Sequence, residues 1–126
     1  MVIDINEITF NRGEEGQLLT TELKLEGVKG EPTIMARPLT RGKLQEIYAK
    51  AISTDDTIRL SADNDIIKFG LEKPELNDKQ IEDLKPSYAT AITTAILSLS
   101  LGIPQVDVGK EARKIIDKEE LALKKK

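Results

Sequence analysis

The sequence of 126 residues contains no cysteine and no histidine. The absence of cysteine excludes disulfide bonds, a thiolate nucleophile and a zinc site built on thiolates. The absence of histidine removes the side chain that most often transfers protons near neutral pH, and also the commonest nitrogen ligand of metals. Catalysis would therefore have to rely on a serine–lysine arrangement or on a pair of carboxylates.

Aromatic residues are scarce as well, at 3% of the chain, and tryptophan is absent. The core must therefore be aliphatic, and such a core stabilises a fold by about 25 cal/mol per Å² of buried apolar area. Charged residues make up 33% of the chain, but both signs are mixed and the net charge is only −3. Few stacking rings and a slightly acidic balance argue against nucleic acid as a partner.

Long apolar runs are also missing. The most apolar stretch, Tyr88 to Leu101, is too short and too rich in threonine and serine for a membrane span of about 20 residues. The first residues reach the acidic Asp4 without the basic and apolar segments that open a signal peptide. We therefore expect no membrane association and a cytoplasmic location.

Motifs that carry chemistry are not found among the residues that are present. The neighbouring carboxylates Asp55-Asp56 are more typical of a helix boundary than of a catalytic pair. The run Asp63-Asn64-Asp65 resembles the start of a calcium loop, but Ile67 and Pro74 stand where that loop needs ligands. The glycines near the N-terminus form no phosphate-binding motif. We predict no cofactor, no metal site, no catalytic residue and no enzymatic activity.

Residues 1–38 have the pattern of short β-strands. Three segments combine apolar or alternating residues with a glycine or proline boundary: 3–10, 18–25 and 33–37. Pro38 should end the third, because proline has no amide hydrogen to donate to a sheet. The pattern predicts an N-terminal β-hairpin or a small antiparallel sheet.

Residues 39–104 have the pattern of a helical core. Thr40 is suited to cap a first helix, whose apolar residues recur at spacings of three and four: Leu44, Ile47, Tyr48, Ala51 and Ile52. Asp63 or Asn64 should cap a short second helix that ends at Gly70.

Two further helices are expected before residue 104. Asn77 or Asp78 would cap a short one. Pro86 suits the first turn of the main helix, and Gly102 suits its end.

Residues 105–126 should form an amphipathic C-terminal helix. Its apolar side would carry Val108, Ala112, Ile115, Ile116 and Leu123. From residue 110 onward the segment has a net charge of +3, within a chain whose total is −3. Two interpretations stay open: a solvated helix face, or a helix that docks on a partner. The predicted fold class is α+β in a single domain, with about four helices after the sheet.

One stretch resembles a known family. The sequence from Ala36 to Leu44 is ARPLTRGKL, and Pro74-Glu75-Leu76 precedes a short acidic segment. A final apolar stretch, Ile96 to Leu101, ends at Gly102. Together these resemble the tail assembly chaperones of long-tailed phages and prophages over residues 33–104. The sequence departs from the pattern at Ser100-Leu101-Gly102, where the family has adjacent serine and glycine.

The resemblance implies a protein that binds the tape measure protein and keeps it soluble until the tail tube polymerises around it. It implies a non-enzymatic role in the host cytoplasm, with the tail tube protein as a second candidate partner. A second copy of this chain is a further candidate partner. The apolar helix faces predict the protein-binding residues, namely Leu44, Ile47, Tyr48, Ile115, Ile116 and Leu123. The alternative interpretation of the first three is that they form the core.

The sequence leaves two other functions open. A structural virion protein, such as a tail tube or head–tail joining component, would use its N-terminal strands as an assembly surface. A small hydrolase would need a carboxylate or serine–lysine site that the sequence does not reveal.

Overall fold

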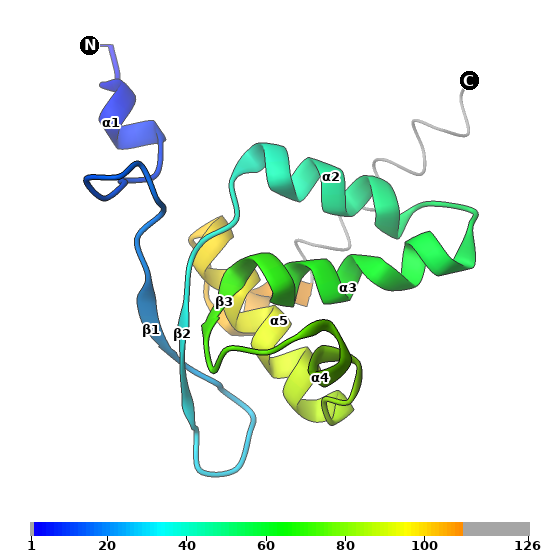
Figure 1. Ribbon diagram of the computed structural model, residues 1–126. Helices are drawn as coiled ribbons and strands as arrows, with labels where there is room; N and C mark the ends of the chain where they lie inside the picture. Colours follow the sequence, from blue (N-terminus) through cyan, green and yellow to red (C-terminus); the bar gives the residue numbers. More distant parts are fainter. Residues whose placement is uncertain (1, 110–126) are drawn as a thin grey trace.

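The computed structural model describes residues 2–109, which form a three-stranded sheet and a set of packed helices (Figure 1). The elements in chain order are α1 (Ile5–Ile8), β1 (Thr21–Lys24), β2 (Thr33–Ala36), α2 (Arg41–Ala51), α3 (Asp56–Gly70), β3 (Leu71–Lys73), α4 (Asp78–Glu82), α5 (Pro86–Leu101) and the 3-10 helix η1 (Gln105–Asp107). This confirms the predicted α+β class, with an N-terminal hairpin followed by a predominantly helical region.

The sheet is antiparallel, in the order β1-β2-β3. β1 and β2 form the predicted hairpin, in which Thr21 pairs with Ala36 and Lys24 with Thr33. The third strand was expected within residues 1–38, but it is β3, which directly follows α3 and pairs with the other edge of β2. The Arg37 amide donates to the Gly70 carbonyl at 2.8 Å, so the end of β2 and the end of α3 are already joined where β3 begins.

The prediction of a strand over residues 3–10 is wrong. Residues 5–8 form the short helix α1, capped by the Asp4 side chain, which accepts from the Asn6 amide at 3.0 Å. Isoleucine favours strands mainly because it packs against neighbouring strands. The described residues provide no such neighbour here, and the local cap decides the conformation.

Two helix starts illustrate what local signals can and cannot specify. The Thr40 hydroxyl accepts from the Lys43 amide at 3.3 Å, so the predicted cap of α2 is confirmed. The predicted start of the second helix at Asp63 or Asn64 is wrong, because α3 begins at Asp56. Asp55 is its cap, and its carboxylate accepts from two amides of the first turn.

The later boundaries agree with the sequence. Asn77 and Gln80 form a reciprocal capping box at the start of α4. Pro86 occupies the first turn of α5, and Gly102 ends that helix in the left-handed conformation with φ +68°.

The core lies between the sheet, α2, α3 and α5. α2 runs beside α3, and α3 packs against α5, which crosses behind them (Figure 1). The largest fully buried side chains come from these three helices: Ile47, Ile67 and Ile96. The core is aliphatic, as predicted, with Tyr48 as its one aromatic member among the described residues.

The predicted C-terminal helix lies mostly outside the described residues. Val108, the first residue of its expected apolar side, is 3% exposed and joins the core. Ile115, Ile116 and Leu123 fall beyond residue 109. Within residues 2–109, no helix has the length and apolarity needed to cross a membrane.

Candidate functional site

The three predicted binding residues that the structure describes all lie on the buried side of α2. Leu44 and Tyr48 are each 8% exposed, and Ile47 is 2% exposed. Ile47 therefore belongs to the core and is not available to a partner. Leu44 and Tyr48 have a second role, because each also lines a groove at the surface.

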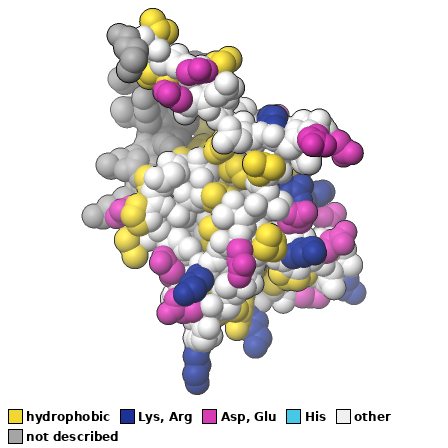
Figure 2. Space-filling model, turned by 90° about the vertical axis from the view of Figure 1, so that its left-hand side faces the viewer, with side chains coloured by type: hydrophobic (Ala, Val, Ile, Leu, Met, Phe, Trp, Pro, Cys, Tyr) yellow, Lys and Arg dark blue, Asp and Glu magenta, His cyan; other side chains and the backbone are white. Residues whose placement is uncertain are grey.

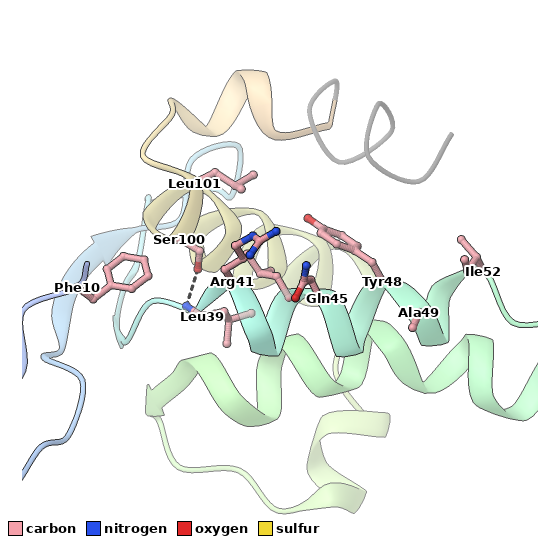
Figure 3. A pocket seen from close by; sticks show the side chains of 10 residues that line it. Phe10, Leu39, Arg41, Gln45, Tyr48, Ala49, Ile52, Ser100 and Leu101 are labelled. Atoms are coloured by element: carbon pink, nitrogen blue, oxygen red, sulfur yellow. Dashed lines mark hydrogen bonds between the residues drawn. The ribbon is translucent and has the colours of Figure 1, made fainter. Parts of the chain in front are cut away.

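This groove lies between α2 and the C-terminal end of α5, with Phe10 at one end (Figure 3). Its volume is about 720 Å³, and we call it the α2–α5 groove. The apolar lining residues are Phe10, Leu39, Leu44, Tyr48, Ala49, Ile52 and Leu101, and the polar ones are Arg41, Gln45 and Ser100. The surface is suited to an apolar segment that brings a few polar groups.

Ser100 holds the two walls of the groove together. Its hydroxyl accepts from the Leu39 amide at 2.7 Å and donates to the Ile96 carbonyl at 2.8 Å. The first of these bonds is drawn in Figure 3. It joins the end of α5 to the connection between β2 and α2, two segments that are far apart in the sequence.

The charge of the groove is positive although the chain as a whole is acidic. Arg41 is the one charged residue among its lining residues. A second hollow adjoins the groove, shares Phe10 and Arg41 with it, and adds Arg12. No acidic side chain is among the lining residues of either hollow.

The Tyr48 hydroxyl is the least satisfied polar group of the groove. It is buried and has no hydrogen-bond partner among the described residues. Burial raises the pKa of Tyr48 above the ordinary value, because desolvation disfavours the phenolate. A buried hydroxyl without a partner is costly.

The described residues contain no group of three or more acidic side chains placed to hold a metal ion. Apart from apolar contact, the groove offers the Arg41 guanidinium and the Gln45 amide, whereas the Ser100 hydroxyl is engaged with Leu39 and Ile96 and the Tyr48 hydroxyl is buried. The guanidinium and the amide can bind and orient a segment.

Sequence reasoning missed most of the groove. Phe10, Arg41, Gln45 and Leu101 were not among the predicted binding residues, although Arg41 and Leu101 lie in the quoted motifs. Nothing in the two motifs indicates that they meet in space. That contact depends on how α5 crosses α2.

No family model, curated protein or solved structure matches this chain.

Proposed function

We propose that this chain is a non-enzymatic tail assembly chaperone of a long-tailed phage or prophage. In this role it binds apolar helical segments of the tape measure protein in the host cytoplasm and keeps that protein soluble before the tail tube polymerises. The α2–α5 groove is the docking surface, and it is the observation that carries the proposal.

The groove supports the proposal because it joins two of the three segments that carry the family resemblance, Ala36 to Leu44 and Ile96 to Leu101. Leu39, Arg41 and Leu44 come from the first of these segments, and Ser100 and Leu101 come from the second. Residues that are far apart in the chain thus build one apolar surface. An amphipathic helix would lay its apolar face on such a surface, as in other helix-in-groove complexes.

The client must be a protein that exposes apolar faces while it waits to assemble. Such faces aggregate if they remain bare. A chaperone with net charge −3 would cover them and add charge that favours solubility.

Co-expression with the tape measure protein of the same genome tests the proposal. We expect the chain to raise the soluble fraction of the tape measure protein and to co-purify with it. Ala49→Glu should abolish both effects, because Ala49 is exposed and lines the groove. Leu60→Glu is the matched control, since Leu60 is 71% exposed on α3 and lies outside the groove.

Two results would overturn the proposal. One is a genome without a tape measure gene beside the gene for this chain. The other is a tape measure protein whose solubility and binding do not change with the chain or with Ala49→Glu.

A structural virion protein is the second candidate, and the sheet is the feature that favours it. β1 is an edge strand, so its outer side is available to a strand of another copy. Glu22 and Lys24 in this strand oppose such pairing, because charged side chains on an edge disfavour it. Purified particles distinguish the two functions: a structural protein remains in them, whereas the chaperone is absent.

A further inference from the structure

The N-terminal residues expose an unusual share of the apolar side chains. Eleven large hydrophobic side chains are at least 36% exposed among the described residues, and five of these lie in the first ten positions: Val2, Ile3, Ile5, Ile8 and Phe10. We call residues 2–9 the N-terminal arm. In Figure 1 its helix α1 stands apart from the helical body, and α1 buries no residue.

The arm is acidic as well as apolar. Asp4 and Glu7 alternate with its isoleucines, and it contains no basic residue. At the top of Figure 2, in the region of α1, apolar side chains lie beside acidic ones. This chemistry is complementary to the α2–α5 groove, whose lining is apolar and whose charged residue is Arg41, and to the adjoining hollow with Arg12.

The arm is also attached at the right place for an exchange between molecules. Asn6, Ile8 and Thr9 line the adjoining hollow, and Phe10 lines both hollows. The arm therefore starts at the edge of the groove and lies along the adjoining hollow, while none of residues 2–9 lines the groove itself. Because α1 buries no residue in its own chain, moving the arm about Thr9 and Phe10 gives up no core contact.

We propose that the N-terminal arm of one copy docks in the α2–α5 groove of a second copy of this chain. Ile5 and Ile8 would contact the apolar lining at Leu44 and Leu101, and the arm's carboxylates would pair with the arginines. Each copy offers one arm and one groove, so the exchange closes a dimer or continues as an open chain. The proposal does not depend on the client proposed above, although a client would compete for the same groove.

Sedimentation velocity of the full chain alone tests the proposal over a wide range of concentrations. We expect reversible, concentration-dependent association. The arm variant Ile5→Asp/Ile8→Asp should remain monomeric and keep its fold, because neither side chain is buried. Arg41→Glu should weaken association by about tenfold or more, which corresponds to about 1.4 kcal/mol. Leu60→Asp and Arg59→Glu are matched controls, as both positions are exposed on α3 away from the groove.

A mixture of the two variants gives the sharper result. The arm variant keeps an intact groove, and the Arg41→Glu variant keeps an intact arm. We expect the mixture to form a heterodimer through one arm. Adding Glu7→Arg to Arg41→Glu should restore self-association.

Three results would overturn this proposal. The first is a wild-type chain that stays monomeric at every concentration, whether its groove is filled by its own arm or by residues 110–126. The second is an arm variant that associates as strongly as the wild type. The third is a control variant that weakens association as much as Arg41→Glu does. None of these results bears on tape measure binding, because the client is absent from the experiment.

Discussion

Gly70 lets α3 approach α5 more closely than a larger residue would allow. A β-carbon at this position would lie 2.5 Å from Cγ2 of Ile96. Ile96 is 0% exposed and belongs to the buried core. The contact joins α3 and α5, two of the three helices that build the core. The absence of a β-carbon at Gly70 therefore affects how these two helices pack, and not only the turn in which it lies.

Gly70→Ala should therefore lower the free energy of unfolding by about 1–3 kcal/mol, the usual cost of overpacking a core. Gly42→Ala is the matched control. A β-carbon there meets nothing within 4 Å, and alanine in α2 should raise stability by up to about 1 kcal/mol. Urea unfolding followed by circular dichroism measures both. Equal effects of the two substitutions would contradict the packing role of Gly70.

The sequence placed Gly70 correctly but gave a different reason for it. Glycine at a helix end commonly adopts a positive φ, and Gly102 does so. Gly70 is not among the residues with positive φ, and the chain continues from it directly into β3. The need for glycine arises from Ile96, a residue that the local sequence does not contain.

At the scale of elements, Ser100 fixes the end of α5 to the start of α2. The Leu39 amide has this hydroxyl as its partner, and Leu39 is 2% exposed. Losing the hydroxyl would leave a buried donor without an acceptor. The α2–α5 groove depends on the same bond for the spacing of its walls.

Ser100→Ala should lower the free energy of unfolding by about 1–3 kcal/mol, the cost of an unsatisfied buried amide. Ser87→Ala at the exposed start of the same helix should change it by no more than about 0.5 kcal/mol. Thermal and denaturant unfolding of both variants provide the comparison. A stability of the Ser100→Ala variant equal to that of wild type would show that the two elements do not depend on this bond.

Elements with strong local signals were predicted well. Caps at Thr40 and Asn77, together with Pro86 and Gly102, fixed helix ends through contacts within one turn. α3 was predicted too short, because the helix is capped further upstream, at Asp55, and because Ile58 and Leu60 in its first half are exposed and do not follow a helical period. α1 was predicted as a strand, but no strand among the described residues pairs with it. β3 was not predicted, because it forms only where β2 lies beside it.

At the scale of the whole molecule, stability should depend on alkaline pH through Tyr48. Burial raises the folded-state pKa of Tyr48 above the value of 10.0 for an exposed tyrosine. The folded state therefore holds this proton more tightly than the unfolded state. The tighter binding of the Tyr48 proton contributes fully to stability below pH 10, and this contribution is lost as the pH rises through the folded-state pKa.

Tyr48→Phe should make the free energy of unfolding less sensitive to pH above 10. At neutral pH the same substitution should raise stability by about 1 kcal/mol, because it removes a buried hydroxyl without a partner. Tyr88→Phe, at a position 37% exposed, is the control. Denaturant unfolding at a series of pH values gives the measurement. An unchanged pH dependence in the Tyr48→Phe variant would show that other groups cause the loss of stability above pH 10.

The sequence by itself determined the α+β class, the β1–β2 hairpin, the aliphatic core and most helix ends. These depend on composition, on periodicity and on contacts within a few residues. The tertiary structure alone decided that Ile47 is core, that β3 completes the sheet, and that Leu39, Arg41 and Leu101 line one groove with Phe10. These outcomes depend on which segments far apart in the chain come together. No local pattern encodes that choice, because it is set by how α2, α3 and α5 pack around a shared core.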